Sequence, residues 1–121
     1  MSGWLRKLQK QSPPPEAHWE VVMEDGSIRV TDPAGDSRAV GKSELSRVAV
    51  ETNDSGPWGA DVWWLLSGAG GVLACAFPLG ATGEKAAVDY LTALEGFDHE
   101  EMVKAMSSTD NRLFALWSRV Q

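Results

Sequence analysis

Histidine and acidic side chains come together once in an arrangement that resembles a zinc-binding helix. The segment His99-Glu100-Glu101 begins like the H-E-x-x-H motif, in which two histidines one helical turn apart bind the metal. Val103 occupies the position of the second histidine, and His18 is the only other histidine in the chain. Acidic residues in the first turn of a helix are explained more simply by the helix dipole. We therefore predict no metal site.

A glycine followed by lysine and serine resembles the end of a phosphate-binding loop. The residues GKS at 41–43 lie downstream of Gly35, but five residues separate the two glycines, whereas the Walker A loop requires four. Asp36 stands where the first glycine is needed. The residues after the motif, 44–51, have the character of a strand, although the loop must lead into a helix. We therefore predict no nucleotide site.

Two residues could serve as nucleophiles, and neither has the surroundings that catalysis requires. Cys75 lies between alanines in an apolar stretch, which is typical of a buried thiol with a raised pKa. Ser55 precedes a glycine, but Asn53 stands where the nucleophile elbow needs another glycine. Two histidines outside any motif offer little material for a general base. These residues favour a non-catalytic protein without a cofactor, and an enzyme stays open as the alternative.

The densest group of aromatic and acidic residues lies between residues 54 and 64. Trp63 and Trp64 are neighbours in a predicted strand, so their side chains point to opposite faces. Either both faces are covered within the domain, or one ring faces solvent, a second layer or a partner, in a recognition surface rimmed by acidic residues. The candidate binding residues are Asp54, Trp58, Asp61, Trp63 and Trp64.

A pair of buried strands must position this group. Residues 60–66 and 72–77 are apolar, and a glycine-rich turn at 67–71 joins them, which is typical of a hairpin. Upstream, alternation of polar and apolar residues, many of them β-branched, predicts shorter strands. Those strands are expected at 19–24, 27–31, 38–42 and 47–52.

Two helices are predicted after the hairpin. Segment 84–95 has apolar residues at helical spacing, and Gly96 follows where a left-handed C-terminal cap belongs. Asp98 has the position of an N-cap for a second helix that ends near Met106. Residues 112–120 are predicted to form a last strand, with a third helix as the alternative.

Composition and charge limit the class of protein. The chain has 121 residues, of which 43% are hydrophobic, so one domain with one core is expected. The net charge is −6, but the first ten residues carry three bases and no acid, which leaves eight bases against seventeen acids. A body this acidic repels nucleic acid. A single cysteine and the lack of a long apolar segment predict a cytoplasmic protein with no membrane span.

The chain divides into an arm and a domain. Residues 1–15 form a basic N-terminal arm with a proline linker, and residues 16–121 form a single α+β domain. The arm has an apolar face made by Trp4, Leu5 and Leu8, which suits a membrane surface or a partner. A frayed or docked terminus is the simpler interpretation.

Three segments resemble a family of small uncharacterised bacterial proteins. They are VAVETNDSGPWGADVWWLL, FPLGATGEKAAVDYLTALEGFDHEEMVKAM and STDNRLFALW, which together span more than half of the chain. The resemblance implies no catalytic activity; some similar small proteins resemble toxin-neutralising immunity proteins, and the early strands resemble a pleckstrin-homology-like sheet. The matching positions are Thr52, Gly56, Pro57, Asp61, Trp63, Trp64, Pro78, Gly80, Gly96, Phe97, Asp98, Asn111, Phe114 and Trp117.

These observations predict a single α+β domain with a curved, mainly antiparallel sheet of six to seven strands and two C-terminal helices packed on one face. A pleckstrin-homology-like partly open barrel is the alternative fold. The predicted core consists of Trp19, Val21, Val50, Trp63 or Trp64, Leu65, Val72, Leu91, Leu94, Phe97, Met102, Met106, Phe114 and Trp117.

The favoured function is a non-catalytic cytoplasmic binding protein that uses the aromatic and acidic surface around 54–64. Because the body is acidic, a basic protein is one candidate partner, and the association should weaken with salt. The alternatives are a small-molecule-binding protein or enzyme with a pocket between the hairpin and the helices, formed by Asp61, Tyr90 or His99, and an immunity protein. Self-association into a homodimer is a further alternative.

Overall fold

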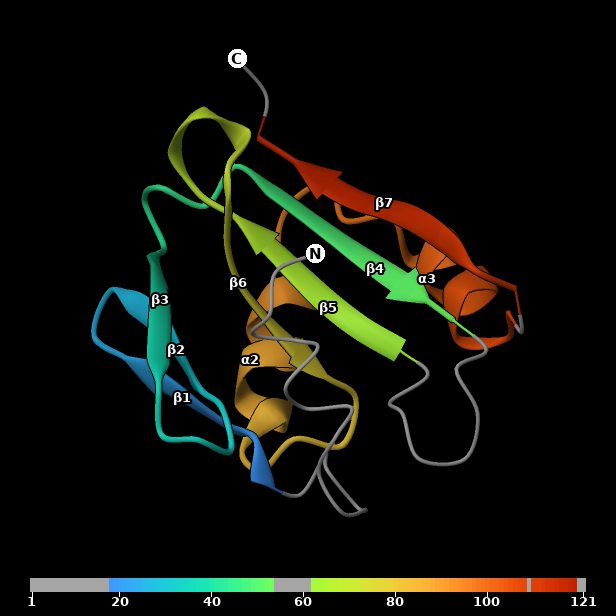
Figure 1. Ribbon diagram of the computed structural model, residues 1–121. Coiled ribbons are helices and arrows are strands. Elements are labelled where there is room, and N and C mark those ends of the chain that lie inside the picture. The colour runs from blue at the N-terminus through green and yellow to red at the C-terminus, as the bar shows by residue number, and fades with distance from the viewer. Residues whose placement is uncertain (1–17, 54–61, 109, 120–121) are drawn as a thin grey trace.

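The computed structural model describes residues 18–53, 62–108 and 110–119, and it confirms the α+β class (Figure 1). Within this part of the chain, seven strands form two antiparallel sheets, accompanied by two α-helices and one short 3-10 helix. The strands are β1 (Glu20–Glu24), β2 (Ser27–Thr31), β3 (Ser37–Gly41), β4 (Arg47–Thr52), β5 (Val62–Ser67), β6 (Leu73–Pro78) and β7 (Arg112–Ser118). The helices are η2 (Ala69–Gly71), α2 (Glu84–Thr92) and α3 (His99–Met106).

The expected single sheet of six to seven strands is divided into two. One sheet has the order β1-β2-β3 and the other has the order β6-β5-β4-β7, and together they do not close into a barrel. The division has a simple cause at β4. Strand β4 pairs with β5 on one side and with β7 on the other. It therefore has no free edge for β3, the strand that precedes it in the chain.

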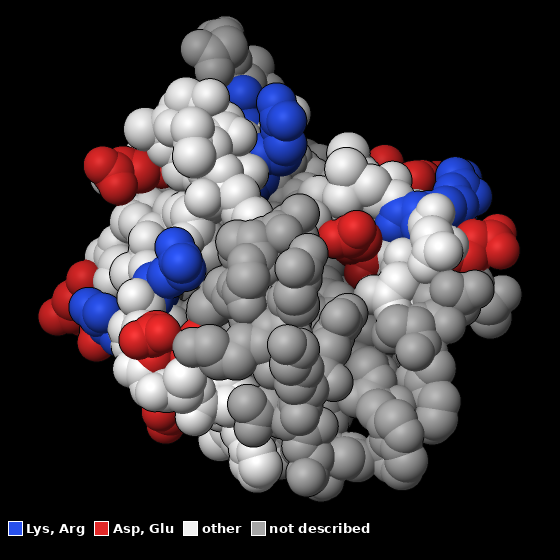
Figure 2. Space-filling view, in the orientation of Figure 1, with Lys and Arg blue, Asp and Glu red and all other residues white. Residues whose placement is uncertain are grey.

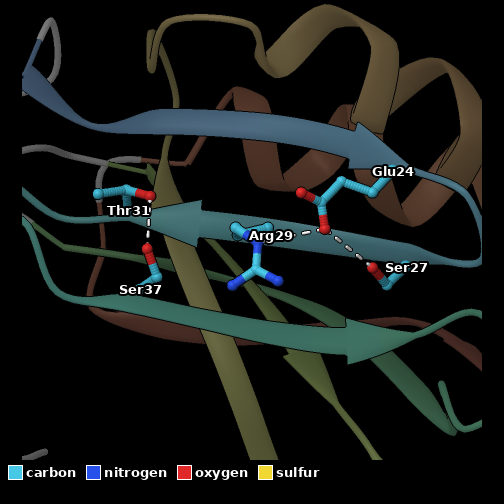
Figure 3. Close-up of polar contacts among 5 residues, drawn as sticks. All are labelled: Glu24, Ser27, Arg29, Thr31 and Ser37. Carbon is cyan, nitrogen blue, oxygen red and sulfur yellow. Dashed lines mark hydrogen bonds and ion pairs between the residues drawn. The ribbon is translucent and has the colours of Figure 1, made fainter.

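The three-stranded sheet is built from two consecutive hairpins. Gly26, with φ of 78°, turns the chain between β1 and β2, whose pairing brings Val21 opposite Val30. Figure 3 shows the polar side of this sheet, where Arg29 Nε donates to Glu24 Oε1 at 3.2 Å and the hydroxyls of Thr31 and Ser37 lie 2.8 Å apart. The apolar side is buried and consists of Val21, Ile28, Val30 and Val40.

The four-stranded sheet supplies a continuous buried row across its strands. Val50 of β4 pairs with Trp64 of β5 and with Phe114 of β7, and Trp64 pairs with Phe77 of β6. The rings of Trp64 and Phe77 stack at 6.2 Å with an angle of 11° between their planes. Each of these four side chains is at most 2% exposed, so the row forms the centre of the core.

Both helices lie behind the strands in the view of Figure 1; α2 contacts β1 of the three-stranded sheet, and α3 contacts β4 and β7 of the four-stranded sheet. The predicted N-cap of α3 is confirmed, whereas the predicted C-cap of the first helix is wrong, because Ala93 caps α2 and Gly96 lies in the turn beyond it. Gly96 has φ of 89°, and Asp98 Oδ1 accepts the backbone N–H of Glu101 at 2.9 Å. Helix α2 ends at Thr92, three residues before the predicted end. The last strand, and not a third helix, follows α3.

A short segment between β6 and α2 joins the two sheets. The backbone of Thr82 donates to Trp19 O and accepts from Val21 N, at 2.8 Å in each case. Gly83, which follows with φ of 81°, lies so close to Val21 that a Cβ atom would overlap the Val21 carbonyl oxygen. Only glycine fits here, because the position requires both a left-handed conformation and a close backbone approach.

Two of the predicted core residues lie on the surface. Val72 is 68% exposed because it lies at the tip of the β5–β6 hairpin, before β6 begins. Met106 is 38% exposed and occupies the last position of α3, where Ala105 is the buried residue. The other predicted core residues are buried or partly buried against the core.

Candidate interaction surface

Trp63 and Trp64 point to opposite faces of β5, and both are buried. Trp63 is 7% exposed and forms a T-shaped pair with Trp19, with 5.3 Å between the ring centres, whereas Trp64 is 1% exposed and stacks on Phe77. The structure therefore agrees with the interpretation that both faces are covered within the domain. Neither indole offers much surface for a partner.

The other three candidate residues, Asp54, Trp58 and Asp61, lie outside the described residues. The strands on either side of residues 54–61, β4 and β5, show where that segment joins the sheet. Thr52, near the end of β4, pairs with Val62 at the start of β5 and also with Arg112 at the start of β7. The chain thus leaves the sheet from β4 beside the first residue of β7 and re-enters it at β5, on the other side of β4.

A buried hydroxyl holds this corner of the molecule together. Thr52 is 1% exposed, and its Oγ1 donates to the backbone oxygen of Asp110 at 2.6 Å. The Ser108 hydroxyl accepts the backbone N–H of Asp110 at 3.1 Å. These bonds connect the end of β4 to the turn between α3 and β7, so the start of β7 has a defined position relative to the rest of the sheet.

The first half of β7 exposes a large apolar side chain on a strand at the edge of the sheet. Leu113 is 64% exposed, whereas its neighbour Phe114, which points to the opposite face, is 2% exposed. Among the described strands, only β4 pairs with β7. An edge strand presents unpaired N–H and C=O groups on its outer side. We call residues Arg112–Ala115 the open edge.

The second half of β7 is closed by other parts of the chain. The backbone N–H of Asp98 donates to Leu116 O at 2.8 Å, and Trp117 Nε1 donates to Glu95 O at 2.9 Å. Arg119, just after the strand, donates through its side chain to the backbone oxygens of Leu45 and Lys42. The corner between the two helices therefore covers the strand from Leu116 onward, whereas no hydrogen bond from the described residues other than those of β4 reaches the open edge.

The charges near the open edge are mixed, with an excess of acid. Between residues 95 and 119, five acidic residues stand against three basic ones. The guanidinium of Arg112 lies 4.8 Å from the centre of the Phe114 ring, and Lys104 lies 3.6 Å from Glu101. Figure 2 shows acidic and basic side chains interspersed along the margins of one face, with no broad basic patch among the coloured residues.

The residues that could have served in catalysis or ligand binding, Cys75, Tyr90 and His99, pack against other side chains or are buried. Burial raises the pKa of Cys75 to about 12, so its thiol is protonated at neutral pH, as predicted for a buried thiol. The Tyr90 ring lies beneath Lys42 Nζ at 4.9 Å, and the His99 ring packs against Phe97. In the described part of the chain, no three His, Cys, Asp or Glu side chains gather as metal ligands.

Comparisons with known proteins do not add a family to this description. No protein-family model, no curated protein and no solved structure matches the chain. The described helices are all too short or too polar to cross a lipid bilayer.

Sequence reasoning did not select the open edge or Leu113. The alternation in the segment RLFALW indicates a strand, but nothing in it indicates that this strand lies at the margin of a sheet. That position depends on its pairing with β4, which is distant in the chain.

Proposed function

We propose that the protein is a non-catalytic cytoplasmic binding protein whose ligand is a protein with a basic contact surface. The observation that carries the proposal is the exposed Leu113 beside an uncovered strand edge, held in place by the buried Thr52 hydroxyl. Exposed apolar groups next to unpaired backbone groups are characteristic of surfaces that bind protein. The acidic net charge of −6 favours basic partners and accelerates their association.

The predicted segment around residues 54–64 extends this proposal. Asp54, Trp58 and Asp61 belong to the connection that leaves the sheet beside the open edge, so a partner at Leu113 is near the end of β4, from which that connection starts. Trp63 and Trp64 then support the surface from within, because both rings are buried.

A pair of matched variants tests the proposal. Leu113→Asp introduces a charge at the proposed surface, and Val72→Asp introduces the same charge at a similarly exposed residue on the β5–β6 hairpin. The immobilised protein is incubated with lysate at low salt, and bound proteins are identified by mass spectrometry. We expect a basic protein that is retained by the wild type and by Val72→Asp, and lost from Leu113→Asp and at high salt.

Equal retention by both variants would place the binding surface elsewhere. The double variant Trp58→Ala/Asp61→Ala then examines the predicted segment separately: loss of the partner there, with Leu113→Asp unaffected, would restrict the site to residues 54–61. An empty capture with folded protein contradicts the proposal of a protein ligand.

A further inference from the structure

We propose that the open edge binds an extended segment of the partner as an additional strand, so that the four-stranded sheet gains a fifth strand in the complex. This inference rests on the proposed function and adds the mode of binding and the chemistry of the recognised segment. In strand addition, backbone hydrogen bonds provide the affinity and alternate side chains provide the specificity.

The first argument is the contrast between the two halves of β7. From Leu116 onward the strand is covered, since Asp98 N–H donates to the Leu116 carbonyl and the Trp117 indole donates to Glu95. Among the described strands, residues Arg112–Ala115 pair with β4 alone. At about 3.3 Å per residue, the open edge has the length for pairing with about four residues of a partner.

The second argument is that the open edge carries few of the features that prevent edge-to-edge pairing. Proteins protect edge strands with proline, lysine, bulges or covering loops. The open edge contains no proline or lysine, and its only charged side chain, Arg112, lies over the ring of Phe114. The register shift opposite Val48 and Ala49 falls after Ala115, in the covered half of the strand.

The surroundings of Leu113 define the chemistry of the added segment. Leu113 is 64% exposed and pairs across the sheet with Glu51, which is partly buried. A partner residue directly opposite Leu113 must be apolar to cover it, because cross-strand neighbours on one face are in contact. The residues on either side of that position point to the opposite face of the sheet, which carries Phe114, and basic side chains there suit the acidic excess of residues 95–119. The recognised segment therefore alternates apolar and basic residues.

The probe is a synthetic heptapeptide of alternating lysine and valine, acetylated and amidated at its ends. Its control is the same peptide N-methylated at every residue, which keeps the side chains and the charge and removes the backbone donors. Both are titrated into the isotope-labelled full-length chain and followed by amide NMR. We expect shift changes centred on residues 112–115 and a dissociation constant at least tenfold weaker for the N-methylated peptide.

The matched variants give an independent readout. We expect Leu113→Asp to weaken binding of the unmodified peptide severalfold or more, because its carboxylate has no apolar surface to offer the valine, and Val72→Asp to have no effect. Equal affinity of the two peptides, with shifts still centred on Leu113, would overturn strand addition and leave the protein-binding function standing. Shifts away from residues 112–115, or no binding at millimolar peptide, would overturn the inference as well.

Discussion

The two sheets of this protein are assembled over different distances along the chain. In the three-stranded sheet, each strand pairs with its immediate neighbour, as where Thr31 meets Ser37. In the four-stranded sheet, β4 pairs with β7, and Thr52 meets Arg112 sixty residues away. The polar contacts differ accordingly. Those in Figure 3 are exposed to solvent, whereas the Thr52 hydroxyl is buried. Local turns can define the first sheet, but the second depends on the completed core.

The largest loss of stability is expected from a variant that disturbs the connection between the two sheets. Gly83→Ala places a Cβ atom against the Val21 carbonyl in a left-handed conformation, and we expect a loss of about 3–4 kcal/mol in the free energy of unfolding. Gly26→Ala is the control, because its φ is similar and its surroundings are open, so about 1–2 kcal/mol is expected. Urea denaturation measures both. Equal losses would mean that the close approach to Val21 relaxes at little cost.

A second pair of variants compares a buried hydroxyl in one sheet with an accessible hydroxyl in the other. Thr52→Val removes the hydrogen bond to Asp110 O while keeping the shape of the side chain, and a loss of about 1–2 kcal/mol is expected. Thr31→Val removes the contact with Ser37, where water can replace it, and a change within about 0.5 kcal/mol is expected. Thermal and urea unfolding measure both variants. If Thr31→Val costs as much as Thr52→Val, burial does not explain the difference between the sheets.

The smallest expected effect concerns a carboxyl near the junction of the sheets. Burial raises the pKa of Glu84 above its ordinary value of 4.5, although a hydrogen bond from Gly80 N–H opposes the shift. The folded protein thus holds this proton more tightly than the unfolded chain does. The resulting stabilisation is complete below pH 4.5 and is lost as the pH rises through the raised pKa.

Glu84→Gln isolates this contribution, since the amide oxygen can still accept from Gly80. We expect the stability of the wild type relative to the variant to fall between pH 4.5 and the raised pKa and to stay constant above it. Urea unfolding across this pH range provides the measurement. A difference that rises with pH would show that the charged form of Glu84 is favoured in the fold.

Local structure could be predicted closely from particular residues. Alternating β-branched residues and the Asp25-Gly26 turn predicted β1 and β2, and Asp98 predicted the start of α3 from its capping position. These signals act over a few residues, where turn and cap chemistry decides the conformation. The hairpin of β5 and β6 was predicted for the same reason.

Pairing over long distances could not be predicted from such patterns. An apolar strand such as 112–118 gives no indication of which edge it joins, and the division into two sheets follows from β7 taking the free edge of β4. Alternation at Trp63 and Trp64 correctly indicated opposite faces, but only the packing of Trp19 against Trp63 shows how the second face is covered. The apolar run predicts Val72 as the first residue of a buried strand, but β6 begins at Leu73 and leaves Val72 exposed at the hairpin tip.

The pairing of β4 with β7 has a consequence for how the chain folds. Joining Thr52 to Arg112 closes a loop of sixty residues, so folding is expected to be slower than for a protein of this size built from local hairpins alone. Before β7 arrives, the apolar strand β4 is itself the margin of the sheet and can pair with other chains. The interval between hairpin formation and the docking of β7 is therefore the stage at which a chaperone would protect this protein most effectively.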